Sequence, residues 1–186
     1  INGGSINSRL LAVVTTPTDG RKGRVFHEPT DMEVSCRNLA IKRLESMVGD
    51  NPELFPTEKM PPKGSLGMAV QGYGMEKWTD VFTARQLITS AILTREVMKI
   101  EDPLTKLVMG LAVSKFNDRN SSMSFYQSSA KPVRFVNVFS SHRLSMTWDF
   151  YEPRPKSCRS SSVDWVASLL NVVPKEPLPH HFQNNL

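Results

Sequence analysis

The stretch "TARQLITSAILTREVMKIEDPLTKLVMGLAVSKFN", residues 83–117, predicts two consecutive helices joined by a short turn. Thr83 and Gln86 match the capping box that begins many helices, and apolar residues at helical spacing follow them. Asp102 and Pro103 start the second helix, because Asp caps a helix and Pro suits its first position. The expected apolar faces are Leu87, Ala91, Thr94, Val97 and Met98 in the first helix and Leu104, Leu107, Val108, Leu111 and Val113 in the second.

A β-hairpin and another helix are predicted before this pair. The segments "RLLAVVTT", 9–16, and "RVFHEP", 24–29, are rich in β-forming residues and flank the turn-prone "PTDGRKG". Thr30 with Glu33 forms a second capping-box pattern, after which apolar residues recur at helical spacing up to Gly49. The expected apolar face consists of Cys36, Leu39, Ala40, Leu44, Met47 and Val48.

The remaining segments are predicted mainly as loops. Residues 50–64 contain four prolines and cannot sustain a helix, and residues 117–132 are polar. We expect 133–139 to be extended, 144–151 to form a short helix, and 161–173 to form a last helix. The predicted class is α+β and helix-rich, an N-terminal β-hairpin followed by about four to five helices with long loops. Residues 1–174 are expected to form a single domain or an internal segment of a larger protein, and 175–186 a flexible tail.

Composition indicates a soluble globular chain. Of its 186 residues, 39% are hydrophobic and 22% are charged, and no apolar run approaches the roughly 20 residues of a membrane span. A cytoplasmic protein without a membrane partner is therefore expected. The chain begins at Ile1 instead of Met, which suggests a processed product or an excised internal segment. Cys36 and Cys158 stand far apart, without Cys or His at metal-ligand spacing, so free buried thiols and no metal site are expected.

No catalytic or cofactor-binding residue is predicted. The glycines of "KGSLGMAVQGYGMEK", 63–77, match neither the dinucleotide-binding nor the P-loop pattern, which favours a turn-rich structural loop. The histidines lack metal-ligand spacing, and no G-x-S-x-G element frames a serine nucleophile. These patterns disfavour nucleotide-binding, zinc and serine-hydrolase chemistry.

Positive charge points to a polyanionic partner. The formal net charge is +5, and residues 131–159 contain six basic side chains against Asp149 and Glu152. Aromatic residues are interleaved with them, a mixture that suits phosphate contact and base stacking, although the same aromatics also suit a core. The predicted nucleic-acid-binding residues are Lys77, Arg85, Lys131, Arg134, Arg143, Arg154, Lys156 and Arg159.

Four ordered blocks resemble the prokaryotic adenine-specific DNA methylases of the zinc-ribbon-containing type. They are "GRKGRVFHEPTDMEV", "PPKGSLGMAVQGYGMEKWTDVFTARQLI", "RNSSMSFYQ" and "HRLSMTWDFYEPRP", and the resemblance spans about 11–172, nearly the whole chain. Members of that family bind S-adenosylmethionine at a Gly-rich turn and present an Asp-Pro-Pro-Tyr motif to the flipped adenine. This chain contains neither motif, nor the zinc-ribbon cysteines.

The resemblance therefore implies the section between the cofactor motif and the catalytic motif of a DNA adenine methyltransferase. Such a section is expected to bind DNA or to complete the enzyme's fold, and to be inactive alone. S-adenosylmethionine is the cofactor of the intact enzyme only, and the partners are DNA and the remaining halves of the methyltransferase. The intact enzyme would serve DNA modification, as in restriction–modification or phage defence. A stand-alone, non-catalytic interaction module or remnant subunit is the alternative.

Overall fold

The computed structural model describes residues 8–15, 17, 19, 23–127, 134–135, 138–139 and 143–153. Within these ranges the chain forms an N-terminal hairpin, three α-helices, four 3₁₀ turns and a second short strand pair. The predicted α+β class with an N-terminal hairpin is confirmed, and the described residues contain three α-helices where about four to five were predicted. The helix predicted over 144–151 is wrong, because this segment is irregular there and forms a single bridge at Leu144. The helix predicted over 161–173 and the tail over 175–186 lie outside the described residues.

The hairpin leads directly into the first helix. Strands β1 (Val13–Thr15) and β2 (Val25–His27) pair antiparallel, with Val14 opposite Phe26. Helix α1 (Asp31–Asp50) begins with the predicted capping box, in which Thr30 and Glu33 accept hydrogen bonds from each other's backbone N–H. An Arg37 nitrogen donates to the backbone oxygen of Ser8 at 2.7 Å, which ties the chain before the hairpin to α1.

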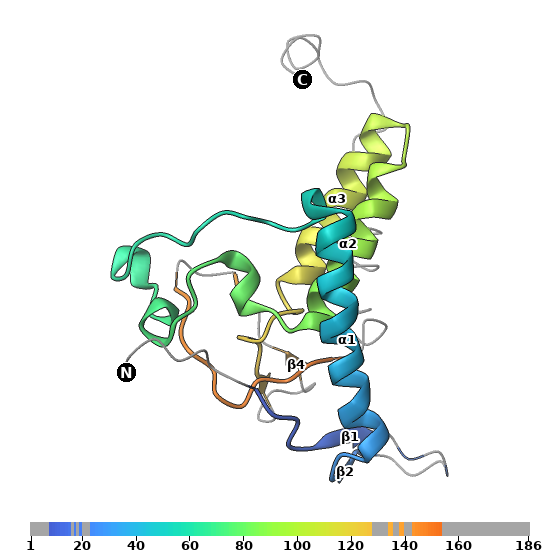
Figure 1. The fold of residues 1–186 in the computed structure, drawn as a ribbon, viewed down its shortest axis with the longest axis vertical. Helices are drawn as coiled ribbons and strands as arrows, with labels where there is room; N and C mark the ends of the chain where they lie inside the picture. Colours follow the sequence, from blue (N-terminus) through green and yellow to red (C-terminus); the bar gives the residue numbers. More distant parts are fainter. Residues whose placement is uncertain are drawn as a thin grey trace.

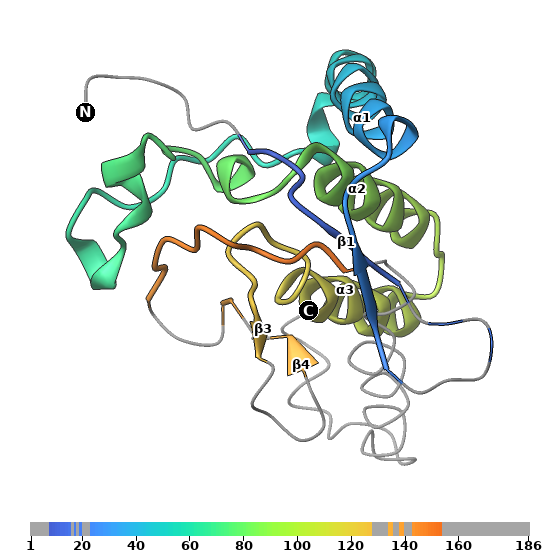
Figure 2. The same cartoon turned by 90° about the horizontal axis from the view of Figure 1, so that it is seen from below.

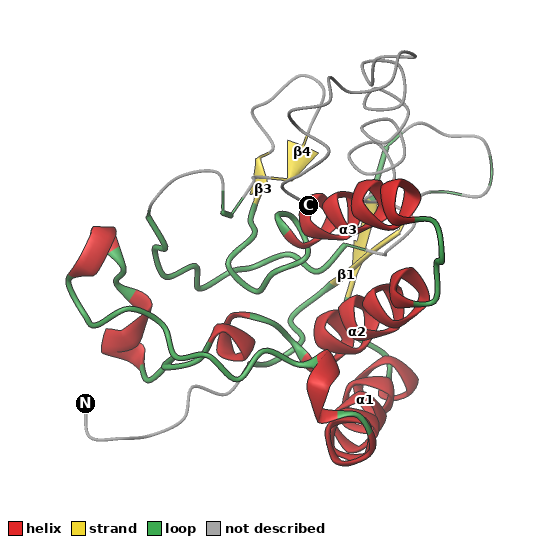
Figure 3. Ribbon diagram, turned by 90° about the horizontal axis from the view of Figure 1, so that it is seen from above, coloured by secondary structure: helices red, strands yellow, loops and turns green. Residues whose placement is uncertain are grey.

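The three helices form a layer with α2 (Ala84–Met98) between α1 and α3 (Pro103–Asn117), as Figures 1 and 3 show. Both predicted N-caps, Thr83 and Asp102, are present. Helices α1 and α2 meet at a small core formed by Met47, Phe55 and Ala91, next to the 3₁₀ turn η1 (Pro52–Leu54).

Helix α3 buries a different face from the predicted one. Its buried residues are Val108, Ala112 and Phe116, of which only Val108 had been assigned to the apolar face. The predicted core residues Leu104, Leu107 and Leu111 are exposed. Helical spacing alone leaves the choice between neighbouring apolar stripes open, and the packing against α2 decides it.

Residues 56–82, 118–127, 138–139 and 143–150 form a second body, here called the loop lobe. Figure 2 shows this lobe beside the helical layer. It contains η2 (Ser65–Gly67), η3 (Val70–Tyr73), η4 (Trp78–Val81) and β3 (Tyr126–Gln127), which pairs with β4 (Arg134–Phe135). Its core consists of Met60, Val70, Val81, Met123, Val138 and Leu144, against which Trp78 and Phe82 pack.

Backbone hydrogen bonds between distant segments hold the loop lobe together. The N–H of Met60 donates to the oxygen of Glu76 at 2.8 Å, and the N–H of Ala69 donates to the oxygen of Leu144 at 3.1 Å. Gly64 and Gly74 turn the chain with φ of 89° and 88°, a region that glycine enters without steric cost. The Gly-rich segment is therefore a folded set of turns, as the sequence predicts.

The polar segment 118–124 joins the loop lobe to the helices and is buried, although we expected a solvated loop there. Ser121 and Ser124 have no exposed surface, and Asn120 is 2% exposed. The Ser121 hydroxyl donates to the oxygen of Val81 at 2.7 Å, and the Ser122 N–H donates to the same oxygen at 2.9 Å. Polar side chains are tolerated in a core when such partners satisfy them, and here they connect two bodies.

The first prediction concerns Leu144, which is 2% exposed in the loop-lobe core. Leu144→Ala leaves a cavity and should lower the free energy of unfolding by about 2–5 kcal/mol. Leu39, which is 62% exposed on α1, provides the matched control. Leu39→Ala should change the free energy of unfolding by less than about 0.5 kcal/mol. Urea unfolding followed by circular dichroism measures both variants, and equal effects would contradict this core assignment.

The second prediction concerns Asp102, the N-cap of α3. Hydrogen bonds from the Thr105 side chain and backbone N–H lower the pKa of the Asp102 carboxyl. Its stabilising contribution is thus present above the unfolded pKa of about 3.9 and is lost as pH falls through the lower folded value. Asp102→Asn keeps the cap but does not titrate, so the difference in thermal midpoint between parent and variant should shrink as pH falls below about 4. A pH-independent difference would refute this role.

Candidate nucleic-acid interface

The predicted basic residues lie in different parts of the molecule. Lys77 precedes η4 and is exposed, and Arg143 is exposed immediately before the buried Leu144, so both belong to the loop lobe. Arg134 lies in strand β4. Lys131, Arg154, Lys156 and Arg159 lie outside the described residues.

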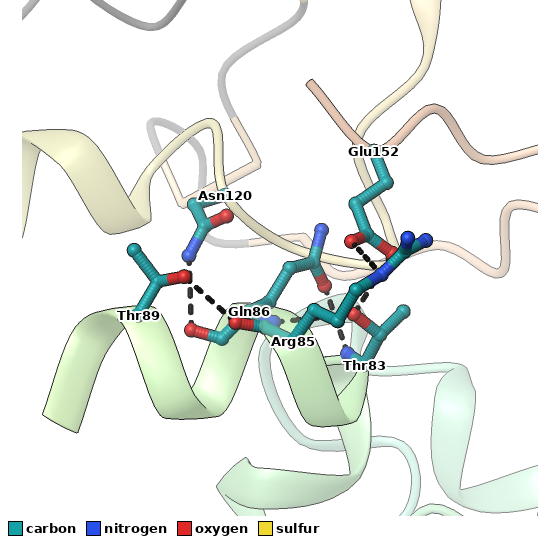
Figure 4. A network of polar contacts seen from close by, with 6 residues as sticks. All are labelled: Thr83, Arg85, Gln86, Thr89, Asn120 and Glu152. Atoms are coloured by element: carbon teal, nitrogen blue, oxygen red, sulfur yellow. Dashed lines mark hydrogen bonds and ion pairs between the residues drawn. The ribbon is translucent and has the colours of Figure 1, made fainter. Parts of the chain in front are cut away.

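Arg85, in the first turn of α2, has a partner within the chain. Its Nε donates to a carboxylate oxygen of Glu152 at 2.7 Å, and the Thr83 hydroxyl donates to the second carboxylate oxygen at 3.0 Å. Figure 4 shows these three side chains together at the start of α2. The ion pair attaches the segment 151–153 to α2, so the arginine predicted to contact DNA also has a structural role.

Buried amides continue this polar network into the molecule. Gln86 is 1% exposed, and its side-chain oxygen accepts from the Thr83 N–H at 2.8 Å as part of the capping box. The Asn120 amide donates to the backbone oxygen of Gln86 at 3.2 Å (Figure 4). The start of α2 is therefore linked to both 118–124 and 151–153, which come from distant parts of the sequence.

A groove of about 520 Å³ lies between α1 and α2 beside this network. Cys36, Leu39 and Arg43 line it from α1, whereas Arg85 and Gln86 line it from α2. Cys36 is a free, exposed thiol here, and not the buried one that we expected. The described residues that line the groove include no histidine, so they do not pair this thiol with an imidazole base.

Among the loop-lobe aromatic side chains whose exposure the structure describes, Trp148 is the most exposed, at 65%. Its ring packs on Tyr73 of the Gly-rich segment in a T-shaped contact, with ring centroids 5.2 Å apart and an interplanar angle of 84°. The Lys63 ammonium lies 3.6 Å from the position that a Cβ on Gly72 would occupy, next to Tyr73 in sequence. Trp148 was one of the aromatic residues interleaved with basic ones, but sequence reasoning missed Tyr73 and Lys63, which long-range backbone pairing brings to this surface.

The charge of the loop lobe is mixed. Lys63, Lys77 and Arg143 are accompanied by acidic residues, among them Asp80 and Asp149. Asp80 accepts hydrogen bonds from the N–H groups of Glu76 and Lys77, both at 2.8 Å, and this use of its carboxylate is structural. The described residues of this lobe carry both signs of charge, so any anion contact depends on individual basic side chains.

Other kinds of site receive no support from the described residues. No three of their His, Cys, Asp and Glu side chains come close enough together to hold a metal ion. None of the helices in the described ranges combines the length and the apolar character that a bilayer crossing requires.

Comparisons with known proteins found no family model, no curated protein and no solved structure that matches this chain.

Proposed function

We propose that this chain is the section of an S-adenosylmethionine-dependent DNA adenine methyltransferase that lies between the cofactor motif and the catalytic motif. It is inactive alone, completes the fold of the enzyme and contacts DNA through the loop lobe. The sequence resemblance supports the choice of enzyme. The observation that carries the fold-completing role is the exposure of apolar faces on both outer helices.

Helix α3 exposes three leucines on one face. Leu104 and Leu107 are each 55% exposed and Leu111 is 44% exposed, at positions i, i+3 and i+7. They lie beside the buried Val108, so the apolar surface of α3 extends beyond the area that α2 covers. An exposed row of large apolar side chains is costly in water and is typical of a surface that another protein element covers.

Helix α1 exposes a comparable row. Val34, Ile41 and Val48 are 43%, 38% and 42% exposed, and they recur every seven residues along one side of the helix. Because α2 lies between α1 and α3, the two rows are on the two outer helices of the layer (Figure 3). A section placed between two halves of an enzyme needs contact surfaces of this kind for both halves.

The third prediction tests fold completion. The isolated chain should transfer no tritiated methyl group from S-adenosylmethionine to DNA, whereas the same chain within its longer reading frame should do so. Leu104→Gln, Leu107→Gln and Leu111→Gln together should leave the isolated chain folded but destabilise the longer protein by about 2 kcal/mol or more, because buried leucines are lost there. The matched control replaces exposed Lys99, Glu101 and Lys106 with Gln.

Two outcomes would overturn the fold-completing proposal. A longer protein that tolerates the three leucine changes as well as the control changes would show that α3 is not covered. A reading frame without a cofactor motif upstream and a catalytic motif downstream would favour the alternative, a non-catalytic interaction module that uses the same exposed rows to bind a partner protein.

DNA contact is the second part of the proposal, and the exposed Trp148 together with three exposed basic side chains of the same lobe favours it. Lys63, Lys77 and Arg143 are exposed on the lobe that carries this aromatic side chain. Flexible cationic side chains neutralise phosphates, and an exposed aromatic ring can contact bases. Contacts of this number give weak binding that depends little on sequence and strongly on salt.

The fourth prediction tests the phosphate contacts. The slope of log affinity against log salt concentration for duplex DNA should fall by up to about three units when Lys63, Lys77 and Arg143 are all replaced by Ala, since each phosphate contributes about 0.9. The matched control replaces exposed Lys42, Lys99 and Lys106 of the helical layer and should change the slope little. Fluorescence anisotropy at several salt concentrations measures both slopes, and equal slopes would remove these three residues from the interface.

A further inference from the structure

We propose that Trp148, supported by Tyr73, is a stacking surface for an unpaired nucleobase of DNA. This inference rests on the proposed DNA contact of the loop lobe and names an unpaired base as the part of DNA that Trp148 contacts. Four observations carry it: the exposure of Trp148, its contact geometry, the anchoring of its backbone and the exposed charges of its lobe.

The indole of Trp148 presents an open face. Tryptophan is on average a well-buried residue, and a side chain that is 65% exposed leaves most of a large apolar ring in water. In a T-shaped pair the edge of one ring meets the face of the other, so Tyr73 covers at most one face of the indole. The remaining face is flat and apolar, which is the shape that a purine or pyrimidine ring requires for stacking.

The backbone on both sides of Trp148 is anchored. The Thr147 hydroxyl donates to the oxygen of Met123 at 3.0 Å, and the Tyr151 N–H donates to the oxygen of Ser124 at 2.9 Å. Both acceptors belong to the buried segment 118–124. The indole is therefore held on a supported backbone, and binding a base would order little additional chain, which favours affinity.

The exposed charges of the loop lobe favour a nucleotide over an apolar protein surface. Lys63 and Arg143 supply exposed cations on the same lobe, and Asp149 follows Trp148 in sequence. A base is neutral, so Asp149 does not oppose stacking, whereas an apolar protein surface would have to desolvate these charges. An enzyme that flips adenine out of a duplex also creates unstacked bases, the flipped one and its former partner.

The experiment measures binding of the full chain to a fluorescein-labelled oligo(dT) strand of about twelve nucleotides and to a duplex of equal length. Trp148→Ala should weaken binding to the single strand about tenfold or more, with an unchanged salt slope, because stacking releases no counterions. Trp148→Phe should recover part of the affinity, and Tyr73→Leu should give an intermediate loss. The matched control is Phe26→Ala, which removes an equally exposed aromatic residue, also 65%, from the hairpin and should have no effect.

The outcomes separate this inference from the proposed DNA contact. If the parent binds the strand with salt dependence and Trp148→Ala binds equally well, the stacking role is refuted while the phosphate contacts stand. If the parent binds neither DNA at low salt, both fail together. If Trp148 of the longer protein is already shielded from acrylamide quenching without DNA, a protein surface covers it and the inference is wrong. If the alanine variant does not fold, Trp148→Leu replaces it, because leucine keeps an apolar side chain without an aromatic face, and equal binding by Trp148→Leu would likewise refute stacking.

Discussion

The buried polar segment 118–124 is the connection on which the rest of the structure depends. It follows α3 directly, and its hydrogen bonds reach the oxygen of Val81 in the loop lobe and that of Gln86 in α2. Separating the helical layer from the loop lobe would break these hydrogen bonds. A buried hydroxyl or amide that loses its partner costs about 1–3 kcal/mol, so the bonds hold the two bodies together. Asp118 extends this connection, because its backbone oxygen and carboxylate accept from the N–H groups of Val138 and Phe139.

The loop lobe shows how a segment with little regular structure becomes ordered. Its 3₁₀ turns are short, and no extended sheet supports Val70, Val81 and Leu144 among the described residues. Order comes from a few buried side chains and from backbone pairs between 59 and 77 and between 68 and 144. This arrangement also places exposed groups from separate segments, Lys63, Tyr73 and Trp148, on one body.

The two kinds of exposed surface belong to different parts of the molecule. The helical layer carries apolar rows on α1 and α3, which suit burial against protein, while the loop lobe carries an exposed tryptophan with mixed charges, which suits a nucleic acid. In the proposed enzyme, the layer would attach the section to the cofactor and catalytic halves, and the lobe would face DNA. The ion pair between Arg85 and Glu152 attaches the segment that follows the loop lobe to α2.

The sequence by itself determined the elements whose signals are local. Thr30, Thr83 and Asp102 mark the three helix starts because capping involves residues only three positions apart, and the prolines of 50–64 exclude a long helix there. Tertiary structure alone decided the buried stripe of α3, the burial of 118–124, the irregular course of 144–151 and the partner of Arg85. It also brought Tyr73 to Trp148, so only part of the candidate site could be predicted. The physical reason is that these features depend on contacts between residues tens of positions apart, which leave no periodic or capping pattern in the chain.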